Sequence, residues 1–316
     1  MIVMQQVPSF FSVVIPLFNK ESSVGRAISS VLSQEFKELE LWVVDDGSED
    51  DSFAVASKFQ DPRLNVYRQT NAGVSRARNR GIKLATADYL CFLDADDAWD
   101  PWHLTEVMRL IESYPDFGLY SVAHRIVESD GSDLIRRIPF TSDACLSARE
   151  FFSVYPRFEL VNSSTACARK QLLLEIGGFP EQATRGEDIY TWMRLVDRGG
   201  FTFSSRPSVT VFRNAENRSN ERPLDGVPFH ISSFLGADAA ELREENRATA
   251  ISAILRNTMF QAVGAARQKD YAALREMAAA ARGHSLVISL FVRLCRLVPG
   301  PAWTFFKKVK DIRGGW

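Results

Sequence analysis

The stretch FLDADD (92–97) holds the residues of this chain that are best suited to chemistry. Asp94 and Asp96 stand two positions apart, directly after the apolar run DYLCFL (88–93). Two carboxylates at this spacing share one hard divalent cation, or one binds the cation while the other binds a hydroxyl. Asp97 adds a third acid, and three carboxylates this close repel each other unless a cation or hydrogen-bond donors offset their charge. A cation held here would bridge a diphosphate and stabilise the charge that develops on it as a leaving group.

One class of phosphatase, with an aspartate nucleophile, also places Asp-x-Asp after a strand. That class has its motif after the first strand, followed by a small residue and Thr or Val. Here the motif follows the fourth predicted strand and continues with Asp97, Ala98 and Trp99, which disfavours a phosphatase.

Polar residues also follow the other apolar runs of the first hundred residues. Ligands of an open parallel sheet lie beyond the carboxyl ends of its strands, so these residues would meet at one edge. Asn, Asp and Gly are the commonest turn formers, so any one segment alone favours a plain turn. Four segments together favour a ligand site. Besides FLDADD, the residues are Asn19 and Glu21, Asp45 to Ser48, and Asn71 to Gly73.

Two further segments could bring charge to such a site. Arg76 and Arg80 share one face of a predicted helix, which indicates a solvated basic face. Arg78 points elsewhere and suits a buried partner of the acids. Asp188 stands at a predicted helix start in GEDIYTWMRL (186–195). There it is either an acidic residue that stabilises the helix N-terminus or a general base.

The elements that must position these residues alternate between strand and helix. Apolar strands separated by amphipathic helices predict an α/β fold, with a mostly parallel sheet and helices on both faces. After Pro101 the pattern loosens into a mixed region (117–185), and from about residue 231 the chain is predicted to be helical. The expected strands are 10–18, 39–44, 63–68, 88–93, 117–127, 163–169, 201–205 and 208–213. The expected helices are 23–36, 48–59 with Ser48 as N-cap, 74–85, one that ends at about Tyr114, one that follows Gly186, 247–267, 270–282 and 285–298.

Composition excludes several classes of protein. The 316 residues are 46% hydrophobic with a formal net charge of −1, which argues against a disordered chain and against a nucleic-acid partner. The apolar runs are too short for a membrane-spanning helix, and the first residues lack the basic region of a signal peptide. The cysteines and histidines are scattered, so we expect no zinc site and a reducing, cytoplasmic setting. Neither a GxGxxG loop nor a Walker lysine loop is present.

Five ordered motifs between about residues 10 and 215 resemble the signature series of family 2 glycosyltransferases. They are Pro16-Leu-Phe-Asn19-Lys-Glu21, VVDDGSEDDS (43–52), NAGVSRARNRG (71–81), FLDADD and GEDIYTWMRL. The resemblance implies the GT-A nucleotide-diphospho-sugar transferase fold and an inverting enzyme that uses a nucleotide-sugar donor, expected to be a UDP-sugar. It also implies a divalent metal, Mg²⁺ or Mn²⁺.

The resemblance further implies three parts. Residues 1–100 would be the nucleotide-sugar-binding half of the GT-A domain, and residues 101–230 would be the acceptor-binding half. Residues 231–316 would be a helical C-terminal extension with a basic amphipathic tail.

Carried over by motif, the resemblance implies a role for each site residue. Asp188 would be catalytic and would deprotonate the acceptor hydroxyl. Asp94 would face the ribose and the metal, and Asp96 would coordinate the metal on the diphosphate. The other donor-binding residues would be Pro16, Phe18, Asn19, Glu21, Asp46 at the base, Asn71, Arg78 and Ala95.

The chain departs from the family pattern at three points. Phe18 stands where the family often has Tyr, which keeps stacking but loses a hydroxyl. The segment FRNAENRS (212–219) lacks the His that many members carry there, so Asn217, Arg218 and Ser219 are expected to serve the phosphates. The QxxRW motif of processive synthases is missing, which favours a non-processive transferase.

Residues 285–316 combine a very apolar stretch, SLVISLFVRLCRLV, with the basic aromatic stretch WTFFKKVK. This pattern predicts either a segment that lies on an anionic membrane, near a lipid-linked acceptor, or a C-terminal helix packed on the domain. With the family resemblance, it implies transfer to a glycan or lipid-linked acceptor in cell-surface polysaccharide assembly, at the inner face of the cytoplasmic membrane.

Two other functions stay open. A sugar nucleotidyltransferase shares a related α/β sheet, but residues 19–26 lack its Gly-rich basic loop. A catalytically inactive nucleotide-sugar-binding or scaffolding subunit would keep the fold without turnover. Release of nucleoside diphosphate separates these functions from a transferase.

Overall fold

The computed structural model describes residues 10–128, 130–135, 138–213 and 226–297. These residues form two compact units, and the chain passes between the units several times. The first unit comprises the described residues of Met1–Leu146, Leu160–Gln182 and Thr191–Arg218, and the second comprises those of Ser147–Glu159, Ala183–Tyr190 and Ser219–Trp316.

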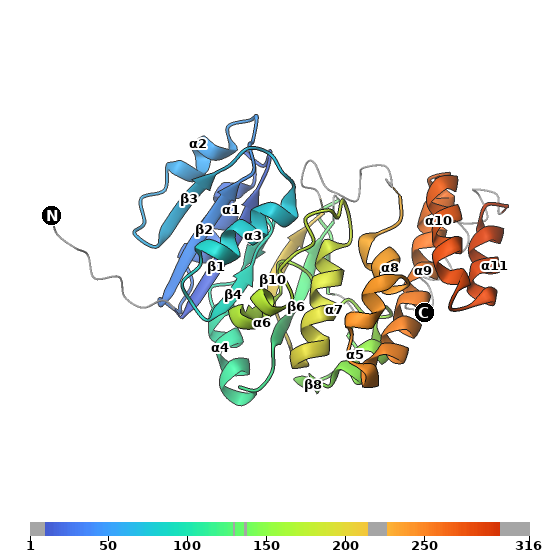
Figure 1. Cartoon of the computed structure of the whole chain (residues 1–316). Helices are drawn as coiled ribbons and strands as arrows, with labels where there is room; N and C mark the ends of the chain where they lie inside the picture. The colour runs from blue at the N-terminus through green and yellow to red at the C-terminus, as the bar shows by residue number, and fades with distance from the viewer. Residues whose placement is uncertain (1–9, 129, 136–137, 214–225, 298–316) are drawn as a thin grey trace. The chain divides into compact units, whose positions relative to one another are not determined.

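The first unit is built on one sheet, which Figure 1 shows with helices beside it. Its main strand order is β3-β2-β1-β4-β9-β6-β10-β5, while β7 pairs with β6 and β8 pairs with β10. The strands are β1 (Phe11–Leu17), β2 (Leu39–Asp45), β3 (Leu64–Arg68), β4 (Tyr89–Phe92), β5 (Ala98–Trp99), β6 (Leu119–Val127), β7 (Asp133–Ile135), β8 (Ala144–Leu146), β9 (Cys167–Arg169) and β10 (Phe201–Phe212).

The first four strands of the sheet are parallel, as the alternating sequence pattern predicts. β1 pairs in parallel with β2 and β4, and β2 pairs in parallel with β3. Beyond β4 the sheet is mixed, because the three-residue strand β9 runs antiparallel to β4 and β6. β10 is parallel to β6 and antiparallel to β5 and β8. The carboxyl ends of β1, β2, β3 and β4 therefore lie at one edge.

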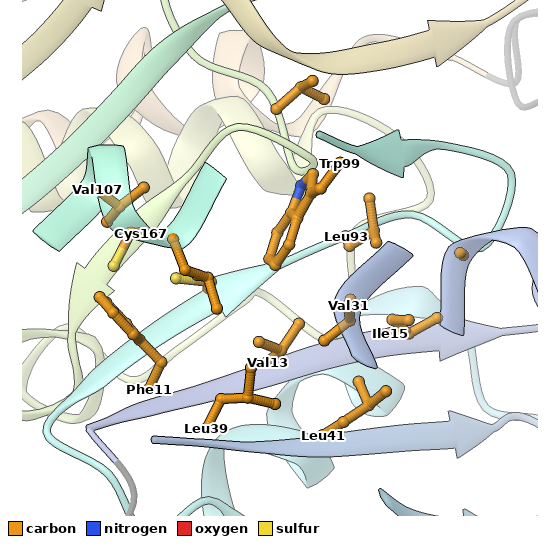
Figure 2. Packing of buried hydrophobic residues seen from close by; sticks show 14 of the residues in the cluster. Phe11, Val13, Ile15, Val31, Leu39, Leu41, Leu93, Trp99, Val107 and Cys167 are labelled. Atoms are coloured by element: carbon orange, nitrogen blue, oxygen red, sulfur yellow. The ribbon is translucent and has the colours of Figure 1, made fainter. Parts of the chain in front are cut away.

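Helices cover both faces of the parallel part. α1 (Val24–Leu32), α2 (Ser52–Ser57) and α4 (His103–Ser113) contribute buried apolar residues to one core cluster with alternate residues of β1. Figure 2 shows Val13 and Ile15 of β1 in this cluster, with Val31 of α1 and Val107 of α4. Successive residues of a strand face opposite sides of the sheet, so Val14 faces away from this cluster.

The opposite face packs against α3 (Val74–Leu84), which contacts β1 and β2. Gly81 of α3 approaches Val14 so closely that a Cβ at position 81 would clash with both methyl groups of that valine. Glycine is thus required here by close approach, and this contact fixes α3 on the sheet. Phe92 of β4 is buried, and its ring packs against the rings of Phe179 and Trp192.

The second unit is helical, as expected from residue 231 onward. Its α9 contacts α5, α8, α10 and α11, and three of these helices have side-chain N-caps, Ser147 on α5, Asp270 on α10 and Ser285 on α11. Ser147 and Glu150 form a capping box at the start of α5. The helices are α5 (Ala148–Val154), α8 (Phe229–Phe234), the 3-10 helix η2 (Ala237–Glu241), α9 (Glu244–Arg267), α10 (Tyr271–Arg282) and α11 (Leu286–Cys295).

Two helices complete the inventory. α6 (Lys170–Glu175) lies in the first unit beside β9, and α7 (Glu187–Gly199) begins in the second unit and continues in the first. Of the helices that the structure describes, none is both long enough and apolar enough to cross a bilayer.

Candidate active site

The turn after β4 presents three carboxylates in graded exposure. The Asp94 side chain is 39% exposed and that of Asp96 is 15% exposed, whereas Asp97 is buried. The turn is closed by a hydrogen bond from the Asp97 amide to the Asp94 carbonyl, and the Asp94 amide donates to Ser164 Oγ. The site predicted from Asp94 and Asp96 is therefore an ordered turn at the carboxyl edge of the parallel strands.

Asp94 is paired with a buried arginine. Nη2 of Arg78 lies 3.0 Å from Oδ1 of Asp94, and the arginine side chain is only 5% exposed. Its guanidinium carbon also lies 5.2 Å from the ring centroid of Phe179. A buried guanidinium needs a charged partner, so this ion pair fixes the orientation of Asp94. The pairing agrees with the expectation that Arg78 is the buried partner of the acids, while Arg76 and Arg80 are exposed.

Asp96 is held by two cations that sequence reasoning did not assign to the site. Lys20 Nζ lies 2.8 Å from Oδ2 of Asp96, and the two side chains are 13% and 15% exposed. Arg26 donates from Nη2 to the Asp96 carbonyl at 2.6 Å, and its guanidinium stacks on the Phe212 ring. Lys20 stands between the predicted donor-binding residues Asn19 and Glu21, and this position at a strand end was the available signal.

Asp97 is a structural member of the turn. Its Oδ2 accepts a short hydrogen bond from Ser164, and its Oδ1 accepts one from the Phe212 amide at 3.1 Å. Burial raises the pKa of Asp97 well above its usual range, and the neighbouring carboxylates of Asp94 and Asp96 raise it further. The side chain thus joins the acidic turn to the end of β10 and to the segment before β9.

The loops after β1 and β2 are bonded to each other. The Asn19 amide donates to Ser48 Oγ at 3.0 Å, and the Asn19 side-chain oxygen accepts from the Glu49 amide at 2.8 Å. Oε2 of Glu21 accepts from the Asp51 amide at 2.9 Å. Asn19 holds a positive φ of 51°, a conformation that asparagine tolerates well. Asn19 and Glu21 therefore hold the loop after β1 and the loop after β2 together at the sheet edge.

The same contacts correct the expected helix over 48–59. Because Ser48 Oγ is engaged with the Asn19 amide, it does not cap a helix, and α2 begins only at Ser52. The residues between Ser48 and Ser52 form a loop at the sheet edge instead.

Asp46 connects the second loop to the third. Its carboxylate accepts from Nε2 of Gln69 and from the amides of Ala72 and Gly73, at 2.8 to 2.9 Å. Gly47 follows at a φ of +74°, and a Cβ there would lie 2.8 Å from the Asn71 amide nitrogen. Asp46 is buried, and both of its carboxylate oxygens accept these hydrogen bonds. It therefore orders the loop that carries Asn71, and Asn71 itself is exposed.

The first unit thus gathers nearly all the predicted site residues at one edge. Pro16 lies in β1 and Phe18 directly after it, both half-buried, and Ala95 is buried in the acidic turn. Asp188, the remaining predicted site residue, belongs to the second unit.

Asp188 stands in the first turn of α7 beside Glu187, where acidic side chains stabilise a helix N-terminus. Its Oδ1 accepts from the Ile189 amide at 2.7 Å. In the same unit, burial raises the pKa of Tyr155, and the charges of Asp188 and Glu159 raise it further. Asp188 is half-buried.

The donor chemistry of the acidic turn fits a hard cation. Mg²⁺ is commonly held by one or two carboxylates and by the phosphates of a substrate, and Asp94 and Asp96 supply two such groups. Within the described ranges no cluster of three or more His, Cys, Asp or Glu side chains is arranged to hold a metal. Any metal at this turn therefore needs further oxygen ligands from the substrate or water. Residues 214–219, which include Asn217, Arg218 and Ser219, lie outside the described residues.

The sheet order and the acidic turn belong to an α/β fold of the GT-A type. The fold is that of residues 1–349 of TarS from S. aureus, whose structure in complex with UDP-GlcNAc superposes with a TM-score of 0.73 at 18% identity over 91% of this chain and 87% of that TarS fragment. The chain belongs to glycosyl transferase family 2, because the model of that family matches residues 12–173, slightly more than half of the sequence.

Two relatives illustrate the range of the family around this chain. The amylovoran biosynthesis glycosyltransferase AmsB of Erwinia amylovora is 32% identical over 204 residues, which are 61% of this chain and 65% of AmsB. The UDP-Glc:alpha-D-GlcNAc-diphosphoundecaprenol beta-1,3-glucosyltransferase WfaP of Escherichia coli is 31% identical over 111 residues, 35% of this chain and 44% of WfaP. The chain thus spans less than two thirds of the length of either relative.

Proposed function

We propose that the protein is an inverting, non-processive glycosyltransferase. It moves a sugar from a nucleotide-diphosphate donor, in our proposal a UDP-sugar, to a hydroxyl of a glycan or lipid-linked acceptor in cell-surface polysaccharide assembly. The observation that carries this proposal is the ordered Asp94–Asp96 turn, with each carboxylate held by a cation, at the carboxyl edge of a parallel sheet. The names of AmsB and WfaP and the UDP-GlcNAc complex of TarS support the choice of pathway and donor.

In this proposal the donor lies along the sheet edge formed by the loops after β1, β2 and β3, which are hydrogen-bonded to one another. Pro16 and Phe18 line the nucleoside pocket, and Asn71 contacts the nucleotide from the loop that Asp46 holds. Asn19 and Glu21 act mainly by ordering the loops, because their side chains bond the backbone of residues 49 and 51. The ring of Phe18 supplies stacking in the nucleoside pocket but has no hydroxyl group to donate a hydrogen bond.

Asp94 and Asp96 are the proposed metal-binding residues. A bound Mg²⁺ or Mn²⁺ would supply positive charge for the diphosphate leaving group. Arg78 orients Asp94 for this role, and Lys20 and Arg26 place two more positive charges at the same edge. These cations favour a polyanionic ligand even before a metal is considered.

Asp188 is the proposed general base. Its carboxylate accepts the proton of the acceptor hydroxyl while that oxygen forms a bond to the anomeric carbon. The bond from the anomeric carbon to the phosphate oxygen breaks on the opposite side, so the configuration inverts and the electron pair leaves with the nucleoside diphosphate. A positioned base contributes on the order of 10²–10⁴-fold, so Asp188→Asn should lower turnover by that factor while donor binding stays intact.

We propose that residues 1–100 form the donor half, residues 101–230 the acceptor half and residues 231–316 an extension. We further propose that the reaction takes place at the inner face of the cytoplasmic membrane. The lipid-linked acceptor in the name of WfaP supports that location.

The test is calorimetric titration of the protein with UDP, GDP and dTDP, with and without Mn²⁺. We expect one nucleotide, UDP, to bind in a metal-dependent way, and Asp96→Ala to lose that binding. Asp61→Ala is the matched control, because Asp61 is also a partly exposed carboxylate in a 2.8 Å ion pair but lies before β3, away from the edge.

Three outcomes would contradict the proposal. Binding that survives a chelator and Asp96→Ala unchanged would remove the metal role. A folded protein that binds no nucleotide, or that binds one but never releases UDP from a UDP-sugar, would indicate an inactive binding or scaffolding subunit. Release of pyrophosphate from a nucleoside triphosphate and a sugar phosphate would instead indicate a nucleotidyltransferase.

A further inference from the structure

Helix α11 exposes an apolar face that is unusual for a protein surface. Four large aliphatic side chains of the helix and one directly after it are about half exposed or more. They are Leu286 at 71%, Val287 at 79%, Leu290 at 57%, Leu294 at 48% and Leu297 at 66%. Residues three and four apart share a helix face, so Leu286, Leu290, Leu294 and Leu297 form one continuous stripe, with Val287 at its side. We call these five residues the α11 face.

The orientation of α11 is fixed by its other side. Ser289, Val292 and Cys295 are buried, and the helix contacts α9 and α10. Ser289 Oγ donates to the Ala278 carbonyl of α10 at 2.7 Å, and Ser285 caps the helix N-terminus. A helix that is apolar all round is normally buried all round. Here the described residues of the unit cover only one side of the helix, so the α11 face requires another apolar environment.

The remaining large exposed apolar side chains do not form a comparable group. Within the described part of the chain they occur singly or as one adjacent pair: Val74, Leu134, Ile135, Leu174, Phe260 and Tyr271. Scattered exposed apolar residues are normal, whereas a contiguous group marks an interaction site.

The charged side chains of residues 285–297 are all positive. Arg293 and Arg296 are exposed on the same helix, and the sequence has no Asp or Glu from Ser285 to Leu297. Arg293 lies three residues after Leu290, so its guanidinium borders the apolar stripe. The sequence beyond, from residue 298, carries Lys307, Lys308, Lys310 and Arg313 against a single acid, Asp311.

We propose that the α11 face binds the surface of an anionic lipid bilayer. The leucines would enter the boundary between headgroups and acyl chains, and the arginines would contact lipid phosphates. Pairing of two α11 faces from two copies is the less suitable arrangement, because it would bring their arginines together and α11 itself has no acid to pair with them. Membrane binding would bring the protein to its lipid-linked acceptor, so the biological purpose of this contact rests on the proposed function. The lipid contact itself can be measured without any donor or transfer.

The experiment is flotation of the full chain with vesicles of phosphatidylglycerol and phosphatidylcholine, compared with vesicles of phosphatidylcholine alone. We expect binding to the anionic vesicles that weakens at high salt. The double variant Leu290→Glu/Leu294→Glu should weaken this binding by about tenfold or more, because it places two carboxylates in the apolar stripe. Leu174→Glu is the matched control, since Leu174 is 54% exposed on α6 and lies outside the face. Thermal unfolding checks that each variant is folded.

Three results would overturn the proposal. One is the absence of vesicle binding by the folded wild type at low salt. The second is equal binding by Leu290→Glu/Leu294→Glu and wild type, which would assign any membrane contact to another segment. The third is a dimer in light scattering that the double variant dissociates while vesicles are not bound, which would make the α11 face an interface between copies. UDP release with a soluble acceptor, measured alongside, shows separately whether the transferase proposal holds.

Discussion

Lys20 holds the carboxylate that we propose as a metal ligand. The ion pair with Asp96 is short, at 2.8 Å, and both side chains are largely shielded from water. A cation that binds Asp96 must compete with the ammonium group for the same oxygen. Lys20 therefore lowers the affinity of the turn for free metal and leaves an additional positive charge for the diphosphate.

We predict that Lys20→Met binds Mn²⁺ more tightly than wild type in the absence of nucleotide. The gain should be up to about tenfold, which corresponds to about 1.4 kcal/mol for one partly buried pair. Titration followed by the electron paramagnetic resonance signal of free Mn²⁺ measures this directly. Lys37→Met is the control, because the Lys37 ammonium bonds a backbone carbonyl, that of Gln34, rather than a carboxylate. Unchanged or weaker Mn²⁺ binding by Lys20→Met would show that the two cations do not compete.

The sequence predicted which side chains lie at the sheet edge better than it predicted the ion pairs and hydrogen bonds between them. Arg78 was expected to be the buried partner of the acids, because only it leaves the solvated helix face, and it pairs with Asp94. The Lys20–Asp96 pair could not be predicted, since it joins residues 76 positions apart, and their proximity depends on the order of β1 and β4 in the sheet. Ser164, which bonds both Asp94 and Asp97, was assigned only to a strand for the same reason.

At the scale of elements, helix α3 is positioned by one glycine. Gly81 lets the helix backbone approach Val14 of β1, and α3 carries Arg78 to Asp94 from the same turn of the helix. The distance between helix and sheet therefore affects the geometry of the site as well as the stability of the fold.

We predict opposite effects for the same substitution in two helices. Gly81→Ala should lower the free energy of unfolding by about 1–3 kcal/mol, because the added methyl group clashes with Val14. Gly264→Ala in α9 has no atom within 4 Å of the new methyl group and should raise the stability by about 0.5–1 kcal/mol. Urea unfolding of the three proteins measures both. A neutral Gly81→Ala would mean that α3 can move away from the sheet at little cost.

The elements themselves were predictable where the pattern is long. The four parallel strands and the helices between them follow from apolar runs and amphipathic stretches of five or more residues. The strands β5 and β9 are two and three residues long and run antiparallel to their neighbours. The sequence predicted strands at 117–127, 163–169, 201–205 and 208–213 in this half of the sheet. Segments as short as β5 and β9 have too little periodicity to reveal their antiparallel pairing.

At the scale of the whole molecule, each unit contains a buried histidine. His103 in the first unit lies 2.8 Å from Ser208 Oγ and stacks on Trp99, and burial lowers its pKa to about 3. His230 in the second unit lies 2.8 Å from the Asn257 side-chain oxygen, and burial lowers its pKa to about 4. Both imidazoles are therefore neutral in the folded protein at all moderate pH values.

We predict that both units lose stability as the pH falls below about 6.5. The unfolded chain then binds protons that the folded chain does not, until the pH reaches the folded pKa values near 3 and 4. Each histidine should lower the free energy of unfolding by about 1.4 kcal/mol at pH 5.5 relative to neutral pH. Thermal unfolding of wild type and His230→Gln at both pH values isolates one contribution, since the other titrating groups are common to both. Equal pH dependence in the two proteins would contradict the assignment.

The interleaving of the two units also has a consequence for the order in which the chain is synthesised. The last turn of α5 relies on Arg256 of α9, whose Nη2 donates to the carbonyls of Phe152, Ser153 and Tyr155. The first of these bonds joins residues 104 positions apart, so at ribosomal rates α5 waits about 5–20 s for its partner to be made. During that interval nearly the whole sheet is completed, while α5 has exposed carbonyl oxygens and an unburied apolar side. On a ribosome, this short helix between β8 and β9 is therefore a segment that a chaperone would need to protect.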